Sequence, residues 1–332
     1  MMIRVITPFL LALFLFSCGG SADKNASEAP VATQPQKAIE LPVFSQDSAF
    51  AFVARQLEFG PRVPNTPAHR ACRNDLIMIL KKYCDTVYVQ DFKARAWDGT
   101  VLELTNIIGS FRPENPARML IAAHWDSRPY ADHDPDPAFH DQPIDGANDG
   151  ASGVGVILEL ARLMHQQAPP RGVDLILFDG EDYGEPRGKE LGTHEFWALG
   201  SAHWARQPHR KAYTAHYGIV LDMVGVPDPQ FTLEGTSMYF APDVMRAVWD
   251  RAAALGYGKW FVKKETTPIV DDHLPVNEIA GIPCIDIIHR ETDGESGFFK
   301  YWHTRQDNLE NVDPASLGMT GRLMVSVIYE GL

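Results

Sequence analysis

The chain is poor in cysteine, and its cysteines follow no pattern that predicts a disulfide framework. Only four occur among 332 residues, and Cys18 lies in an N-terminal leader. Cys72 lies within a helical pattern, Cys84 near its end, and Cys284 in an apolar, strand-like run. These three allow at most one disulfide, and their spacing matches no cysteine-rich zinc site. We therefore expect three buried thiols.

Long apolar runs, basic clusters and a nucleotide-binding loop are also missing. The N-terminal apolar run, Val5 to Phe16, is too short to span a membrane comfortably. A net charge of −13 and the lack of a basic stripe argue against nucleic-acid binding, while an acidic surface favours cationic or amine-bearing substrates. Glycines occur between 146 and 155, but no Gly-Lys-Ser/Thr follows them, so a phosphate loop is rejected.

The first forty residues have the composition of an export leader and a linker. Arg4 precedes the apolar run, and Leu15-Phe16-Ser17-Cys18 resembles a bacterial lipobox. This predicts a signal peptide over residues 1–18, lipidation of Cys18, and an anchor to a membrane that faces the periplasm or cell surface. An ordinary cleaved signal peptide is the alternative. Residues 19–40 show no apolar periodicity and predict a disordered tether to a catalytic domain over 41–332.

Apolar strand-like runs alternate with helical patterns through the rest of the chain. This predicts an α/β fold with a single doubly wound, mainly parallel sheet flanked by helices. Polar residues 128–144 are expected to form a solvated loop rather than a second cation site, and 183–200 a loop over the site. Strands are expected at 86–93, 102–111, 119–123, 174–182, 217–224 and 282–288, and helices at 45–59, 68–82, 152–167, 243–255 and 315–329.

Six ligand-type side chains lie at or just past the ends of strand-like runs, or at a helix start. Because the carboxyl ends of parallel strands meet at one edge of a sheet, these side chains are expected to share one crevice. Carboxylate oxygens and imidazole nitrogens without thiolates suit zinc in a catalytic setting. A single such histidine would usually be structural, but six coincidences together indicate a metal site. The six are His124, Asp149, Glu181, Asp182, Asp222 and His303.

These motifs resemble the zinc aminopeptidases of peptidase family M28 over most of residues 45–330. Within that family the chain is more similar to the animal-type glutaminyl cyclases. The shared stretches include Phe178-Asp179-Gly180-Glu181, Asp271-Asp272-His273-Leu274-Pro275 and Trp302-His303-Thr304.

The resemblance to the cyclases implies one zinc, held by Asp149, Asp182 and His303 with a fourth position open. It implies that Glu181 carries protons while a peptide or protein with N-terminal Gln is converted to pyroglutamate and ammonia. We expect a monomer.

The same resemblance implies further residues around the zinc. Asp222 and Asp271 would form a hydrogen-bonded carboxyl pair beside Glu181. Trp302 would wall the substrate pocket, and so would Trp197 from the 183–200 loop.

An M28-type aminopeptidase that hydrolyses N-terminal residues is the alternative, and the chain contains every ligand that it needs. Asp149 would then bridge two zinc ions, with His124 and Asp222 completing one site and Asp182 and His303 the other. Glu181 would deprotonate metal-bound water. A non-catalytic binding module is the third hypothesis, and the retention of all these residues argues against it.

Two departures from the animal cyclases concern the site. Those enzymes carry Glu where this chain has Asp182, which is one methylene shorter but also a zinc ligand. They carry a cysteine where this chain has Ala123, so their disulfide near the site is absent. Asp307 could orient His303 or cap the turn that follows it. Trp125 could lie in the core or in the pocket.

Overall fold

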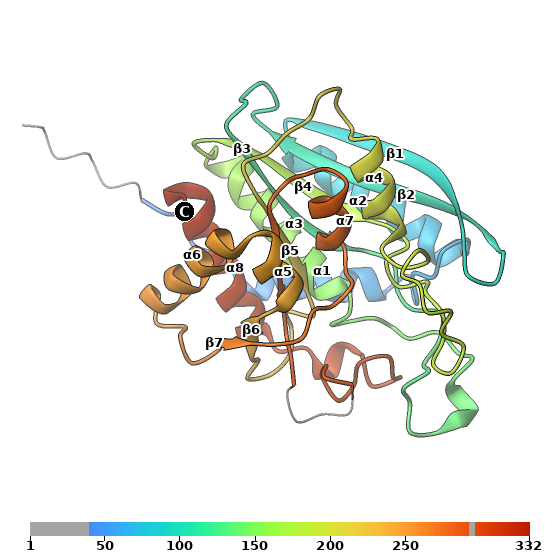
Figure 1. Ribbon diagram of the computed structural model, residues 1–332. Helices are drawn as coiled ribbons and strands as arrows, with labels where there is room; N and C mark the ends of the chain where they lie inside the picture. Colours follow the sequence, from blue (N-terminus) through green and yellow to red (C-terminus); the bar gives the residue numbers. More distant parts are fainter. Residues whose placement is uncertain (1–39, 292–295) are drawn as a thin grey trace, which may run out of the picture. The chain divides into compact units, whose positions relative to one another are not determined.

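The computed structural model describes residues 40–291 and 296–332, which are shown in Figure 1. The predicted signal peptide, Cys18 and all of the predicted tether except Glu40 lie outside the described residues. Within the part of the chain that is described, no helix is long and apolar enough to cross a membrane.

A six-stranded sheet forms the centre of the fold, in the order β1-β2-β4-β3-β5-β8. Strands β4, β3, β5 and β8 are parallel, whereas β2 runs antiparallel to both of its neighbours. The predicted mainly parallel sheet is thus confirmed, with a β1–β2 hairpin at one edge. The bounds are β1 Thr86–Arg95, β2 Val101–Phe111, β3 Arg118–His124, β4 Gly172–Phe178, β5 Gly218–Asp222 and β8 Cys284–Ile288.

Helices cover both faces of this sheet because its inner strands are apolar on both sides. In β3, Ile121 and Ala123 contact the larger core, and Leu120 and Ala122 contact the smaller one. The larger core includes α1 (Gln46–Leu57), α2 (Pro67–Tyr83), α3 (Ala151–Gln166), α6 (Pro242–Ala254) and α8 (Pro314–Glu330). The smaller core includes α4 (Leu199–Arg206) and α7 (His273–Glu278), which lie in front of the sheet in Figure 1.

The main differences from the sequence prediction concern short elements. Helix α5 (Gly235–Phe240), helix α7 and a two-stranded parallel sheet of β6 (Phe231–Leu233) and β7 (Phe261–Glu265) were not predicted. Elements of this length carry too few residues to establish a periodic pattern. The predicted strand 174–182 ends earlier, because the chain turns after Phe178 and Gly180 adopts a φ of 71°.

The expectation of a solvated loop over 128–144 is wrong for its central carboxylates. Asp132 and Asp134 are buried, and arginines compensate for their loss of hydration. Arg128 binds both oxygens of Asp132, at 2.9 and 2.7 Å, and Arg305 lies 3.2 Å from Asp134. Arg305 is far from Asp134 in the sequence, so that pairing depends on tertiary structure, and Arg128 pairs with Asp132 four residues away without a helix to indicate it.

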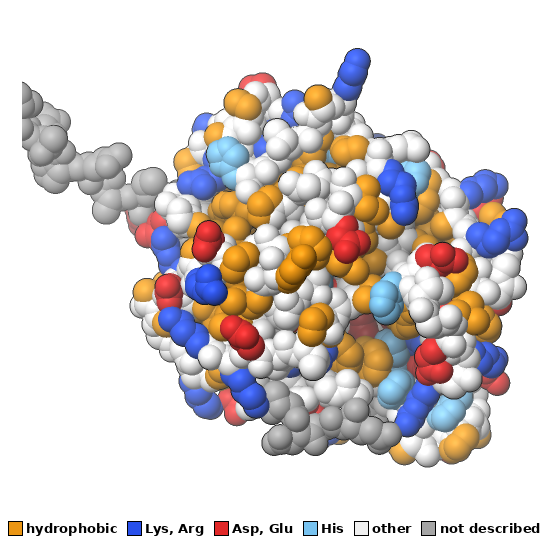
Figure 2. Space-filling view, in the orientation of Figure 1, with side chains coloured by type: hydrophobic (Ala, Val, Ile, Leu, Met, Phe, Trp, Pro, Cys, Tyr) orange, Lys and Arg blue, Asp and Glu red, His pale blue; other side chains and the backbone are white. Residues whose placement is uncertain are grey.

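Several single-residue predictions can be compared with the structure directly. Ser45 caps α1, because its hydroxyl accepts a hydrogen bond from the backbone N–H of Ser48. Trp125 is a core residue rather than a pocket residue, and its ring stacks on His69. Of the three described cysteines, all of them free thiols, Cys84 is only half-buried. Figure 2 shows acidic and basic side chains interspersed over one face of the molecule.

Candidate active site

The carboxyl edge of the parallel strands gathers all six of the ligand-type side chains. His124 ends β3, Asp222 ends β5, and the turn after β4 carries Glu181 and Asp182. The predicted convergence of strand ends therefore occurs. Asp149 lies just before α3, and His303 comes from the segment between β8 and α8.

Asp149, Asp182 and His303 form a buried donor set that fits a metal ion. One ligand atom from each lies within 4.8 Å of the others. His303 Nε2 is 3.2 Å from Asp182 Oδ1 and 3.6 Å from Asp149 Oδ2. Asp182 Oδ2 is buried and has no hydrogen-bond partner among the described residues, which is costly unless a cation lies beside it. Two carboxylates and one imidazole are a donor set that zinc accepts.

Asp149 also belongs to a second donor set, with His124 and Asp222. His124 Nε2 lies 3.0 Å from Asp149 Oδ1 and 3.3 Å from Asp222 Oδ1. Because Asp149 presents one oxygen to each histidine, the two sets are adjacent and share this carboxylate. The residues present are therefore sufficient for one ion or for two.

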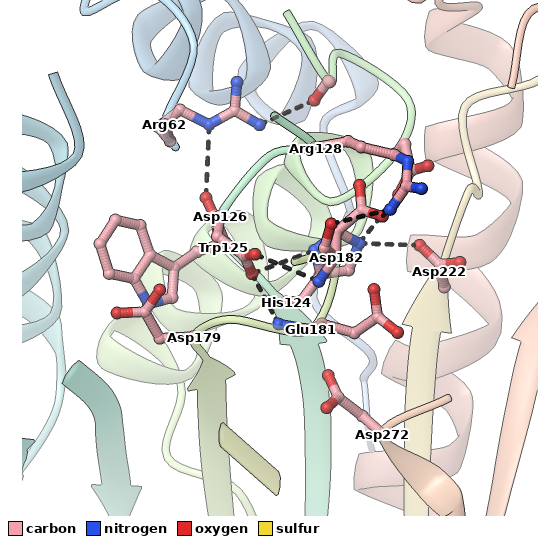
Figure 3. A network of polar contacts seen from close by, with 12 residues as sticks. Arg62, His124, Trp125, Asp126, Arg128, Asp179, Glu181, Asp182, Asp222 and Asp272 are labelled. Carbon is pink, nitrogen blue, oxygen red and sulfur yellow. Dashed lines mark hydrogen bonds and ion pairs between the residues drawn. The ribbon is translucent and has the colours of Figure 1, made fainter. Parts of the chain in front are cut away.

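The buried guanidinium of Arg128 organises the ligands around His303. It donates a hydrogen bond to each carboxylate oxygen of Asp132, and Asp132 Oδ1 lies 3.4 Å from His303 Nδ1. Its Nη1 also donates to the carbonyl of Asp182 at 3.1 Å and lies 3.4 Å from Asp182 Oδ1 (Figure 3). A carboxylate behind a ligating histidine fixes the orientation of the imidazole ring. Sequence reasoning missed both Arg128 and the role of Asp132.

Asp126 fixes the turn that carries the acidic pair. Its two oxygens accept the backbone N–H groups of Glu181 and Asp182, each at 3.2 Å. The same carboxylate lies 3.5 Å from His124 Nδ1. The His-Trp-Asp motif thus places a ligand at the end of β3 and, two residues later, an anchor for the turn after β4.

Asp307 holds the loop that carries Asp149, which differs from both predictions made for it. Its oxygens accept the backbone N–H groups of Asn148 and Asp149, at 2.7 and 3.1 Å. Burial raises the pKa of Asp307 to about 7.

Gly150, which directly follows Asp149, has a φ of 90°, and a Cβ there would lie 2.7 Å from the His124 ring. Only glycine combines this backbone conformation with this close approach.

Glu181 points away from Arg128 and toward other carboxyl groups (Figure 3). Burial raises the pKa of Glu181 well above its usual range, and the carboxylates of Asp271 and Asp182 act in the same direction. Burial likewise raises the pKa of Asp222 to about 7. Asp222 and Asp271 line the same pocket. A direct hydrogen bond between them stays a prediction.

A pocket of about 350 Å³ opens above these groups, and aromatic side chains form much of its wall. Trp302 stacks on His303 with ring centroids 3.7 Å apart. Trp197 and Phe298 also line the pocket, and Trp197 donates a 2.8 Å hydrogen bond to Glu185. Both tryptophans expected near the substrate thus lie at the pocket, together with Phe298, which sequence reasoning missed.

Comparison with known proteins gives matches over most of the chain. The model of peptidase family M28 matches residues 106–328. The crystal structure of a Zn-dependent exopeptidase from Parabacteroides distasonis is 50% identical, with a TM-score of 0.86, and the match covers 87% of this chain and 99% of that one. The Bacteroides thetaiotaomicron glutaminyl cyclase, solved bound to N-acetylhistamine, is 47% identical, with a TM-score of 0.85 and the same coverage. Bovine glutaminyl-peptide cyclotransferase is 25% identical over 299 residues, which cover 82% of this chain and 78% of its own.

The position of Trp197 depends on the absence of a side chain at Gly184. A Cβ at residue 184 would lie 1.9 Å from the Trp197 ring. We expect Gly184→Ala to displace this ring, to change the near-ultraviolet circular dichroism, and to lower the free energy of unfolding by about 1–3 kcal/mol. Gly258→Ala is the control, because its nearest neighbour would be 3.7 Å away. Equal stability and equal spectra for both variants would contradict the close packing of Trp197.

Proposed function

The chain belongs to peptidase family M28, and we propose that it is a zinc-dependent glutaminyl-peptide cyclotransferase. It converts the N-terminal Gln of peptides and proteins to pyroglutamate and releases ammonia. The observation that carries this proposal is the buried carboxyl group of Glu181 beside the Asp149–Asp182–His303 donor set in one small pocket. The similarity to the Bacteroides thetaiotaomicron glutaminyl cyclase supports it.

The size and lining of the pocket suit a single N-terminal residue. A volume of about 350 Å³ is at the lower end of the range for small-molecule sites. Trp197 and Trp302 provide flat walls against which a Gln side chain can lie while water is excluded. Asp149, Asp182 and His303 would hold the zinc ion, which when bound supplies a Lewis acid for the side-chain carbonyl of the substrate.

Glu181 is positioned to move the one proton that the reaction transfers. The α-amine of the substrate attacks the γ-carbonyl carbon of the same residue, so a new carbon–nitrogen bond closes the ring. Glu181 accepts a proton from the attacking amine and delivers it to the departing nitrogen, which leaves as ammonia when the amide bond breaks. No water is consumed. A carboxyl group with a raised pKa suits this exchange, since it must both accept and release the proton near neutral pH.

We propose that one zinc is bound, in the set that contains Asp182 and His303. The support is the resemblance to the glutaminyl cyclases, because short contacts occur in both sets: His124 Nε2 lies 3.3 Å from Asp222 Oδ1, and His303 Nε2 lies 3.2 Å from Asp182 Oδ1. A hydrogen bond between Asp222 and Asp271, as the cyclase resemblance implies, would hold Asp222 away from a second ion.

A two-zinc aminopeptidase is the second candidate, because the shared carboxylate of Asp149 is what a bridging ligand requires. His124 and Asp222 would then ligate the second ion, and Glu181 would take a proton from water rather than from an amine. The similarity to the Parabacteroides distasonis exopeptidase is a second observation that favours the aminopeptidase. The two activities differ in their products, so a product analysis separates them.

We also propose that the protein is exported and anchored through a lipid on Cys18. Only the sequence of residues 1–18 supports this proposal. Labelling of expressing bacterial cells with an alkyne-bearing fatty acid should tag the wild-type protein and leave a Cys18→Ala variant untagged. Equal labelling of both, or labelling of neither, would contradict the lipid anchor.

Product analysis of the zinc-loaded protein tests the proposed activity. A peptide that begins with Gln should lose the mass of one ammonia, and a peptide that begins with Leu should stay intact. Glu181→Gln should lower kcat by roughly 10²- to 10⁴-fold because it removes the proton carrier but keeps the shape of the side chain. Glu190→Gln, an exposed change in the same loop region, serves as the control.

Release of a free N-terminal amino acid from either peptide would instead identify an aminopeptidase. Full activity of the Glu181→Gln variant would show that the role assigned to Glu181 is wrong for both candidates.

A further inference from the structure

A second hollow adjoins the active-site pocket and has not been used in the mechanism. Its volume is about 340 Å³, and it shares His194, Trp197 and Val270 with the catalytic pocket. It extends over α4 and α7 to the edge strand β1, where Phe92 lines it. We call it the α4–α7 groove. In Figure 2, hydrophobic side chains gather over these two helices, next to the hollow in which acidic side chains are visible.

The α4–α7 groove has a mixed lining, with more apolar than polar surface and charged residues of both signs. Leu274 and Ile279 contribute aliphatic side chains from the α7 side, and Ala202 leaves room on α4. Ile279 has 41% of its surface exposed, so part of its side chain is available for contact with a ligand in the groove. The charged lining residues are Lys93, Arg206, Glu195 and Glu278, two of each sign.

The shared wall connects this groove to the path that a bound peptide must take. The catalytic pocket has room for one residue, so the remainder of a peptide substrate has to leave through its mouth. Trp197, Val270 and His194 line both hollows, and a chain that passes over them enters the groove. Each further residue of an extended chain adds about 3.3–3.6 Å, so a few residues are enough to reach it.

We propose that the α4–α7 groove binds the segment of the substrate that follows its N-terminal residue and prefers an apolar side chain there. This inference rests on the proposed function, because it takes the N-terminal residue to be held in the catalytic pocket. The two acidic and two basic lining residues give no reason to prefer an acidic or a basic side chain, whereas Leu274 and Ile279 offer contact to an aliphatic or aromatic one. The substrate class is thus peptides with N-terminal Gln and a nearby apolar residue.

A positional peptide series tests the groove. Hexapeptide amides of Gln followed by glycines would carry one Leu, moved from position 2 to position 6, and Gln-Gly-amide would serve as the short reference. We expect kcat/KM from ammonia release to rise roughly tenfold over the all-glycine peptide when Leu occupies one position between 3 and 5. The gain should appear in KM, because the groove binds the ground state and the transition state equally.

Variants of two similarly exposed aliphatic residues locate the effect. Ile279→Gln changes the groove, and Leu255→Gln changes a residue outside it that is 38% exposed. The quantity compared is the ratio of kcat/KM for the best Leu peptide to that for Gln-Gly-amide. This ratio should fall to near the all-glycine value in Ile279→Gln and keep its wild-type value in Leu255→Gln.

The outcomes separate the two claims. Ammonia release from every Gln peptide at one common kcat/KM, or a Leu preference that survives Ile279→Gln, would overturn the groove and leave the proposed function intact. A lack of ammonia release from all Gln peptides, including Gln-Gly-amide, would overturn the proposed function itself.

Discussion

The concentration of buried carboxylates at one edge of the sheet is the constraint on which the rest of the site depends. Asp149 and Asp182 are buried side by side, which is unfavourable unless positive charge or hydrogen-bond donors compensate. Arg128 supplies part of this compensation, because its guanidinium lies 3.4 Å from Asp182 Oδ1 and donates a hydrogen bond to Asp132. Asp132 in turn lies 3.4 Å from His303 Nδ1. A cation between the two carboxylates would supply the remainder. Metal binding and the stability of this edge are therefore expected to be coupled.

The sequence predicted where the candidate ligands lie better than it predicted the residues that hold them in place. His124, Asp182 and Asp222 could be placed together because each follows an apolar run, and parallel strands end at one edge. Arg128 gave no such signal, since it lies in a segment without helical periodicity that would pair it with Asp132, and Asp182 is brought to it only by tertiary structure. Asp132 was predicted to be solvated, because the composition of its segment indicates a solvated loop, but it is buried.

The sequence indicated which tryptophans line the pocket, but it did not indicate how closely they pack against their neighbours. Trp197 and Trp302 could be assigned to the pocket from the resemblance to the cyclases. That Gly184 makes room for the Trp197 ring becomes evident only when the two are seen in contact. The short helix α7 was unpredictable from periodicity, and it forms one side of the groove beside the pocket. If the α4–α7 groove binds the substrate as proposed, part of substrate selection would depend on an element with a weak sequence signal.

We propose that one metal ion lies in the Asp149–Asp182–His303 set and that Asp222 is not a ligand. An anomalous-difference map from zinc-loaded crystals, with data collected on both sides of the zinc absorption edge, tests this most directly. We expect one strong peak, between Asp182 and His303. A second peak of comparable height between His124 and Asp222 would contradict it and would favour the two-zinc aminopeptidase.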